Sequence, residues 1–454
     1  MFRKIKNIFY YKRIFVELVF LWKIIFFNLF INNKILISIL YLVNNKIFSK
    51  FKKGYFSIFL NGEVLPNKAC RSIVFIGESY YCFFYLAKAL KKRGWKAISV
   101  SLTSNDSPSS FLSHGCDLNL YSSDAAQRKK NIKFFLDVIS KEYKMIHFYS
   151  DFMILDNYMN HIIPLDIIAL KNHGVKIGYT PSGCLDACTQ SQIYQHTKGL
   201  CDKCVWQNNF YVCSDRKNFH LINKVINIVD FISYEADGSI GIEGNLDDIP
   251  AVSTEPLLYA LDPDYWDPNI EIPQQYKIKK KSEKHLIVLT SFANQKIRTN
   301  HKKDIKGVRA MQKAIDQLIG ENYSIQHIHV SNVPSKDLRY IQAQSDIIID
   351  QLNYGRYGAF AREGMMLGKP VICKIDYLSD SINNSALKEC PIIRADEESI
   401  YTVLKKIINL PEKTRQNIGK LSRAYMMKWH SAESCAERFE KIYDRLIERN
   451  NKCL

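Results

Sequence analysis

The chain has 454 residues, a formal net charge of +18, 47% hydrophobic residues and 24% charged residues. This composition excludes a largely disordered, collagenous or low-complexity chain. Only the N-terminus carries a long apolar run, which excludes a polytopic membrane protein. Residues 1–60 hold eleven Lys or Arg and one acid, so they alone carry +10. Because no compact basic motif or aromatic platform accompanies the charge, we expect no nucleic-acid partner.

The segment 1–60 is basic, aromatic and apolar. Residues 14–31 form an apolar run behind a basic flank, but Glu17, Lys23 and Asn28 interrupt it. A charge near the centre of a membrane-spanning helix costs roughly 2.5–3.5 kcal/mol. The run therefore favours a helix lying on an anionic membrane surface, with a true span and soluble packing as the alternatives. No small-residue cleavage site follows, which argues against a removed signal peptide.

Residues 70–257 alternate between short apolar runs and helical stretches, which predicts a first Rossmann-like domain. Such alternation is typical of a parallel sheet covered on both faces. The predicted strands are residues 72–77, 97–102, 145–149 and 175–180, and the predicted helices are residues 79–93, 130–142 and 164–172.

A Pro-, Asp- and Lys-rich stretch, residues 258–283, has no clear period and predicts a linker. The alternation then restarts over residues 284–430 and predicts a second Rossmann-like domain, followed by a C-terminal helix over 431–454. The expected fold is therefore α/β, with two Rossmann-like domains facing a cleft and a helical extension at the N-terminus. The second-domain strands are predicted at 285–290, 325–330, 346–350, 370–375 and 391–394, and helices at 308–319, 334–344 and 414–450, the last broken near 429–430.

The most informative stretch is DIIIDQLNYGRYGAFAREGMMLGKPVICKI, residues 346–375. A predicted strand ends near Asp350 and a Gly-containing loop leads to a short helix that holds Glu363. Gly358 permits a close approach of the backbone to a ligand, and the following helix N-terminus offers N–H groups to a phosphate. Glu363 can accept hydrogen bonds from ribose hydroxyls. An ordinary strand–helix–strand unit, in which Gly358 only permits a turn, is the alternative.

This stretch resembles the donor-site signature of GT-B glycosyltransferases, in particular the retaining family 4 (group 1) enzymes. Their Phe-Gly, Glu-Ala-Met-Ala and Gly-x-Pro-Val-Ile are matched here by Tyr357-Gly358, by residues 363–366 and by residues 368–372. The resemblance implies that Glu363 binds the ribose of a nucleotide sugar. The first acid of the family's paired glutamates would fall at Gly355. A subset of the family reads Asp-Gln-Leu and Gly-x-Tyr-Gly here, as this chain does, so the departure is interpreted as a subfamily feature.

Two further positions agree with a donor site in the second domain. Lys306-Gly307 follows the first strand of that domain, where the family places a Lys-Gly that meets the pyrophosphate. Arg298 is the expected partner, with His301, Lys302 and Lys303 as competitors. In the first domain, Gly77 ends the first strand, where the fold places a loop facing the donor. The predicted donor-binding residues are Gly77, Arg298, Lys306, Gly307, Tyr357, Gly358 and Glu363.

The predicted catalytic residues are His147 and Asp186. His147 is expected at the end of a strand, and Asp186 follows the next strand. Open α/β sheets bind ligands at the carboxyl ends of their strands, so both are candidates for contacts with the acceptor. A packed or capping role is the alternative for each.

Five of the twelve cysteines fall within 30 residues, in an insertion over 184–213, and include one C-x-x-C pair. Two thiolates at that spacing can chelate one tetrahedral Zn²⁺, and a second pair would complete a four-cysteine site. A disulfide, an iron–sulfur site and unliganded thiols are the alternatives. The candidate metal ligands are Cys184, Cys188, Cys201, Cys204 and Cys213.

These patterns together predict a glycosyltransferase that needs no cofactor for its chemistry, with a structural zinc at the cysteines. The expected partners are a nucleotide sugar (UDP-, GDP- or similar), a glycan or lipid-linked acceptor, and an anionic membrane surface. The expected location is cytoplasmic and peripheral at the inner membrane face, in lipopolysaccharide or other cell-surface polysaccharide biosynthesis. A non-catalytic protein that binds sugar nucleotides or glycans is the alternative, favoured by Gly355.

Overall fold

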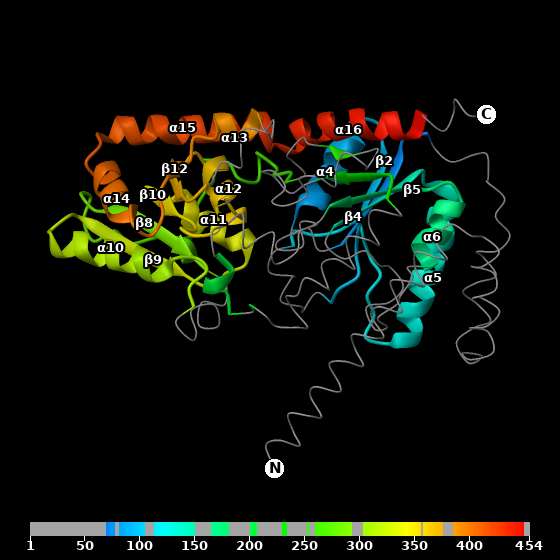
Figure 1. Ribbon diagram of the computed structural model, residues 1–454, viewed down its shortest axis with the longest axis horizontal. Helices are drawn as coiled ribbons and strands as arrows, with labels where there is room; N and C mark the ends of the chain where they lie inside the picture. Colours follow the sequence, from blue (N-terminus) through cyan, green and yellow to red (C-terminus); the bar gives the residue numbers. More distant parts are fainter. Residues whose placement is uncertain are drawn as a thin grey trace, which may run out of the picture.

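Two parallel β-sheets organise the chain, one in each of two α/β domains (Figure 1). The predicted segment 1–60 lies outside the described residues. Among the residues that are described, no helix is long and apolar enough to cross a membrane. The computed structural model describes residues 70–77, 81–104, 113–149, 165–180, 200–205, 207, 229–233, 252–253, 259–292, 303–355, 357–375 and 385–448.

The first sheet has the strand order β3-β2-β1-β4-β5-β6-β7, and every neighbouring pair is parallel. The order reverses between β1 and β4, as in a Rossmann fold. The predicted Rossmann-like domain is therefore confirmed. The strands are β1 (Ser72–Ile76), β2 (Lys96–Ser101), β3 (Leu118–Asn119), β4 (Met145–Tyr149), β5 (Lys176–Thr180), β6 (Phe231–Ser233) and β7 (Val252–Ser253).

Helices cover both faces of the first sheet. Ile73 and Phe75 of β1 belong to the core on the side of helix α4 (Cys82–Lys92), whereas Val74 and Ile76 belong to the core beneath α5 (Ala125–Glu142) and α6 (Leu165–Asn172). Because both faces are covered, all five residues of β1 are buried. This explains why the strand is a continuous apolar run rather than an alternating one.

The second sheet has the order β12-β11-β10-β8-β9, again with every pair parallel. Its order reverses between β8 and β10, the arrangement of a flavodoxin-like doubly wound sheet. The two-domain α/β fold expected from the sequence is thus confirmed. The strands are β8 (Leu286–Ser291), β9 (Ile325–Val330), β10 (Ile347–Ile349), β11 (Val371–Cys373) and β12 (Ile393–Arg394).

Helices of the second domain also form two layers. Side chains of α10 (Val308–Gly320) and α14 (Ile400–Ile408) share one core with the sheet. Residues from α12 (Ala359–Met366) and α15 (Glu412–Trp429) belong to a second core that continues into the first domain. This shared core joins the two domains. The remaining helices are α11 (Ser335–Ala343) and α13 (Ser385–Glu389).

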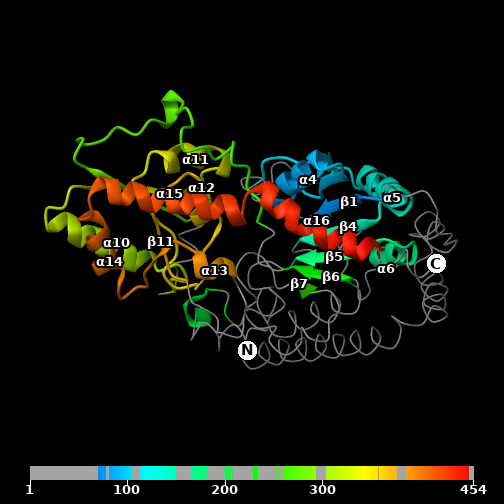
Figure 2. The same cartoon turned by 90° about the horizontal axis from the view of Figure 1, so that it is seen from above.

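The chain passes between the domains at two places that lie side by side. Leu261 forms a parallel bridge with Ser431, and the Leu261 N–H donates to the carbonyl of His430 at 2.9 Å. After this crossing, α15 lies over the second domain and helix α16 (Ala432–Glu448) lies over the first (Figure 2). The predicted helix break near residues 429–430 therefore marks the return of the chain to the first domain.

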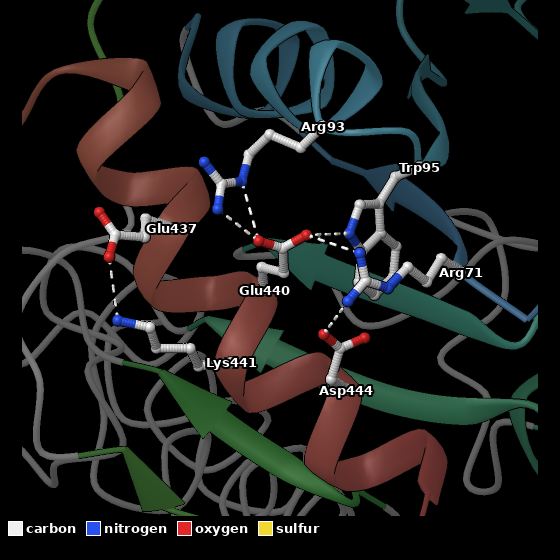
Figure 3. Close-up of polar contacts among 7 residues, drawn as sticks. All are labelled: Arg71, Arg93, Trp95, Glu437, Glu440, Lys441 and Asp444. Atoms are coloured by element: carbon white, nitrogen blue, oxygen red, sulfur yellow. Dashed lines mark hydrogen bonds and ion pairs between the residues drawn. The ribbon is translucent and has the colours of Figure 1, made fainter.

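Glu440 anchors α16 to the first domain (Figure 3). Its carboxylate accepts hydrogen bonds from Arg93 Nε at 2.9 Å, Trp95 Nε1 at 3.0 Å and Arg71 at 3.1 Å. Asp444, one turn later, accepts from Arg71 at 2.8 Å. Burial favours the neutral form of Glu440, but the hydrogen bonds from Arg93 and Trp95 and the charges of the two arginines outweigh it and lower the pKa of the carboxyl.

Candidate functional site

The strand order of each sheet reverses once, and ligands of doubly wound folds bind outside the carboxyl ends of strands at such a point. In the first sheet the reversal lies between β1 and β4, and in the second between β8 and β10. The candidate site is therefore sought among the described residues that follow β1, β8 and β10.

The segment after β8 leads into helix α10, whose first turn is capped by a side chain. The carboxylate of Asp304 accepts hydrogen bonds from the N–H groups of Val308 at 3.0 Å and Arg309 at 2.8 Å. The first turn of α10 therefore already binds an anion from its own chain. Lys306 donates to the Gln351 side chain, which belongs to the segment after β10. The N–H of Leu352 donates to the Lys306 carbonyl at 2.9 Å, so the two segments are joined by main-chain and side-chain contacts.

Asp350 directly follows β10 and binds the far end of the loop that leads to α12. This carboxylate is 3% exposed and accepts a hydrogen bond from the Gly358 N–H at 2.9 Å. No described side chain caps α12, which begins at Ala359. The φ angle of Gly355 is +77°, in the left-handed region that disfavours other residues. The local backbone therefore disfavours the acid that the family resemblance expects here.

Glu363 lies inside the molecule rather than on an open surface. It is 3% exposed, and its carboxylate accepts from Tyr81 Oη at 2.8 Å, Ser335 Oγ at 2.9 Å and Gln342 Nε2 at 3.3 Å. Burial raises the pKa of Glu363 to about 7, against these hydrogen bonds, and the charge of Asp350 raises it further. A ribose can reach this carboxylate only by taking the place of one of its present partners.

Tyr81 comes from the other domain, immediately before α4, and carries this contact across the interface. Its ring centroid lies 4.6 Å from that of Trp266 and 4.7 Å from that of His114. His114 in turn lies 3.2 Å from the Ser335 hydroxyl through Nε2. The segments after β1 and after β10 therefore meet, and the carboxyl edges of the two sheets face each other at their reversal points.

Gly77 ends β1 at this same edge. Its φ angle is +119°, and a Cβ atom placed there would lie 2.3 Å from the Tyr149 carbonyl oxygen. Only glycine allows the ends of β1 and β4 to approach so closely. Gly307 is similarly restricted, because its φ angle is +74° and a Cβ would lie 2.8 Å from that of Leu352. Both glycines have a packing role in this edge, whatever they bind.

The structure places His147 differently from the sequence expectation. It lies in the middle of β4, not at its end, and is fully buried. Its Nδ1 lies 2.7 Å from Tyr443 Oη and its Nε2 lies 2.8 Å from Thr180 Oγ1. Burial lowers the pKa of this imidazole to about 3. These contacts favour the packed alternative, and a contact with the acceptor has no support among the described residues. Asp186 and Arg298 lie outside them.

Tyr357 also faces the core. It is 2% exposed, and its hydroxyl lies 2.7 Å from Tyr425 Oη and 3.1 Å from His430 Nε2. Its ring lies beneath the buried Arg362 guanidinium, 4.9 Å from the centroid. The side chain thus packs toward the crossing between the domains. Gly358, the next residue, instead donates its N–H to Asp350.

Of the five candidate metal ligands, the described residues include Cys201 and Cys204, on and after the 3₁₀ turn η4 (Leu200–Lys203). The Cys204 N–H donates to the Cys201 carbonyl at 3.0 Å, and both thiols are free of disulfides. Within the described part of the chain, no group of three or more His, Cys, Asp or Glu could hold a metal ion. Cys184, Cys188 and Cys213 lie outside that part, so zinc binding stays a prediction.

Lys306 contacts the segment after β10, which also holds Gly358, and Glu363 lies on the helix that follows. The structure adds residues that the sequence did not single out, namely Tyr81, Ser335 and Gln342. Tyr81 and Glu363 are 282 positions apart, and no local pattern marks such a pair.

No family model and no curated protein matches this sequence. Among solved structures, the catalytic domain of starch synthase IV from Arabidopsis thaliana is 12% identical with a TM-score of 0.48, over 83% of this chain and 99% of that one. A UDP-forming α,α-trehalose-phosphate synthase from Burkholderia xenovorans is 10% identical with a TM-score of 0.49, over 83% and 99%. A UDP-N-acetylglucosamine 2-epimerase is 12% identical with a TM-score of 0.43, over 85% and 97%. At these identities and scores the likenesses assign no activity to this chain.

Proposed function

We propose that this chain is a glycosyltransferase that takes a sugar from a nucleotide donor bound at the carboxyl edge of the second sheet. The observation that carries the proposal is the meeting of the two carboxyl edges, where Tyr81 of one domain lies 2.8 Å from Glu363 of the other. Each edge is the ligand-binding position of its own fold. A donor held by one domain would therefore lie next to an acceptor held by the other.

The proposed chemistry uses cations and helix N–H groups in place of a metal. Lys306 and the uncapped first turn of α12 would stabilise the negative charge that develops on the leaving diphosphate. Glu363 would bind the ribose hydroxyls after exchanging one of its present donors. Retention of configuration at the sugar is proposed from the sequence resemblance alone.

The acceptor and the location are proposed on the sequence of residues 1–60. A basic aromatic segment suits an anionic membrane surface, which favours a lipid-linked or cell-surface glycan acceptor and a peripheral position at the inner membrane face. Asp186 remains the proposed contact with the acceptor. A structural zinc at the cysteine insertion is proposed on the spacing of its thiols.

One observation favours a second candidate, a non-catalytic protein that binds sugar nucleotides. Gly355 occupies the position of the first acid of the family's pair, and its left-handed backbone disfavours any acid there. Binding of a nucleotide sugar without hydrolysis or transfer would support this candidate over the enzyme.

The test is a panel of UDP-, GDP- and ADP-sugars, scored by thermal stabilisation and by release of the nucleoside diphosphate. We expect at least one donor to raise the melting temperature and to be turned over. Glu363→Gln should lower the affinity for that donor by about tenfold, because the neutral amide is a poorer acceptor for ribose hydroxyls than the carboxylate.

Lys313→Met is the matched control, because Lys313 is an exposed residue of α10. It should bind the donor as the wild type does. If no nucleotide sugar stabilises the wild-type chain, the proposed function is wrong. If Glu363→Gln leaves donor affinity unchanged, the assignment of the ribose site is wrong.

A further inference from the structure

The turn between Cys201 and Cys204 contacts the donor edge of the second domain. Lys203, the residue before Cys204, donates from Nζ to Asn353 Oδ1 at 2.9 Å and also to a carboxylate oxygen of Glu397. Asn353 follows β10, and Glu397 follows β12. A cation of the first-domain insertion thus lies on the loops of the second domain.

These two loops contact the segment after β8 that carries Lys306 and Gly307. The Asn353 amide donates to the Asp304 carbonyl at 3.0 Å and to Glu397 Oε1 at 2.7 Å. A Cβ atom at Gly307 would lie 3.3 Å from Glu397 Cγ and 3.4 Å from Asn353 Nδ2. The Lys203 ammonium is therefore one side chain away from the Lys306–Gly307 turn.

A second lysine fixes the turn in this position. Lys303, three residues before Lys306, donates to the Asp202 carbonyl and, at 3.2 Å, to Gln207 Oε1. The turn is thus bound from both sides, by Lys303 of the second domain and through its own Lys203. Three lysine side chains consequently gather at one rim of the second sheet.

The pair between Lys203 and Glu397 is open to exchange. Their side chains are 42% and 31% exposed, and ion pairs with that exposure contribute little to stability. A nucleoside diphosphate carries more negative charge than one carboxylate and offers more acceptor oxygens to an ammonium group. It can therefore compete with Glu397 for the same cation.

We propose that Lys203 binds the diphosphate of the donor, as a cation that the first domain supplies to the site on the second. Glu397 holds the ammonium group in place until the nucleotide arrives. This inference rests on the proposed function. It also gives the cysteine turn a role, because the backbone between Cys201 and Cys204 determines where Lys203 lies.

The experiment measures the affinity of the full chain for UDP, GDP and ADP by calorimetry, and then for the nucleoside of whichever binds. Lys203→Met should lower the affinity for the nucleoside diphosphate by about tenfold, because a charge-assisted hydrogen bond is lost. It should leave the matched nucleoside within about twofold. Lys203→Arg should retain most of the affinity, and Lys313→Met should behave as the wild type.

A second variant, Glu397→Gln, distinguishes binding of the diphosphate by Lys203 from a purely structural role, because the two roles predict different changes in diphosphate affinity. Glu397→Gln releases the ammonium group, so the diphosphate should bind as tightly as before or more tightly. If Glu397→Gln and Lys203→Met weaken it equally, Lys203 only holds the domains together and the proposal is wrong. It is also wrong if Lys203→Met binds the diphosphate like the wild type. Failure of the wild-type chain to bind any of the three nucleotides would instead overturn the proposed function itself.

Discussion

Two buried carboxylates, Glu440 and Glu363, each contact side chains of the first domain, but their neighbours differ in charge. Glu440 on α16 is bound by two arginines and an indole N–H, and the pKa of its carboxyl is lowered despite burial. Glu363 on α12 is bound by neutral side chains and lies near the charge of Asp350, and burial raises its pKa to about 7.

The difference separates a structural contact from a candidate functional one. A buried charge with well-placed cations stabilises the folded chain, because removing either partner leaves the other unpaired. A buried carboxylate without a cation is held at some cost in stability, and groups with such perturbed pKa values are concentrated at functional sites. This contrast makes Glu363, and not Glu440, the candidate for contact with a ligand.

The largest expected effect is that of Glu440, the structural carboxylate, on the free energy of unfolding. Glu440→Ala should lower the free energy of unfolding by about 3 kcal/mol, because it leaves Arg93 and Trp95 without their acceptor. Urea unfolding measures this value. Glu437→Ala is the matched control, since Glu437 lies one turn earlier on α16, is exposed, and pairs with Lys441 at 3.0 Å (Figure 3).

Glu437→Ala should change the free energy of unfolding by about 0.5 kcal/mol or less, as for other exposed pairs four residues apart on a helix. Equal losses in the two variants would mean that the Glu440 cluster does not hold α16 on the first domain. Glu440 could then no longer serve as the structural carboxylate of the comparison.

The next effect concerns Glu363 and has the opposite sign. Glu363→Gln keeps an oxygen for Tyr81 and Ser335 and removes a buried charge, and it gives up only the long hydrogen bond of 3.3 Å from Gln342. At pH 7.5 we expect the variant to be as stable as the wild type or more stable. Glu440→Gln should instead lose about 2 kcal/mol, because it neutralises a carboxylate that two arginines bind.

The pH dependence sharpens this prediction. The ordinary pKa of a glutamate is 4.5, whereas that of folded Glu363 is about 7. Between these values the folded chain keeps a proton that the unfolded chain has lost, so this group's contribution to stability falls as pH rises. Relative to Glu363→Gln, the wild type should lose about 3 kcal/mol of stability between pH 4.5 and 8. A difference that stays constant over this range would mean that Glu363 titrates normally.

The sequence predicted the alternation of the two domains well, because buried parallel strands are continuous apolar runs. The strands at 145–149 and 325–330 have the predicted bounds. The helix α14 (Ile400–Ile408) was missed, and so were the short strands β3, β6 and β7. A strand of two or three residues is too short to show an alternation of polar and apolar residues. Its pairing is decided by the neighbouring strand rather than by its own sequence.

The candidate site was predicted less completely, because sequence patterns do not reveal burial or contacts between domains. The motif predicted a short helix that follows a glycine loop and holds Glu363 about one turn in, as the structure has it. It could not reveal that Tyr81 covers this carboxylate, or that Tyr357 turns toward Tyr425 and His430. His147 was expected at a strand end, whereas it lies in the middle of β4, where the buried hydroxyl of Tyr443, 296 positions away, is one of its partners.

The smallest expected effect tests whether His147 only packs. Tyr443→Phe removes the hydroxyl that lies 2.7 Å from His147 Nδ1 and leaves that nitrogen buried and unpaired, while Thr180 still bonds the other nitrogen. We expect a loss of about 1–2 kcal/mol in the free energy of unfolding. Donor turnover should stay within about twofold, because the ring is buried against Phe439 and Tyr443 of α16 and its low pKa keeps it neutral near pH 7. A tenfold fall in kcat with little change in stability would show instead that the orientation of His147 matters to the reaction, and would restore its predicted place on the acceptor side.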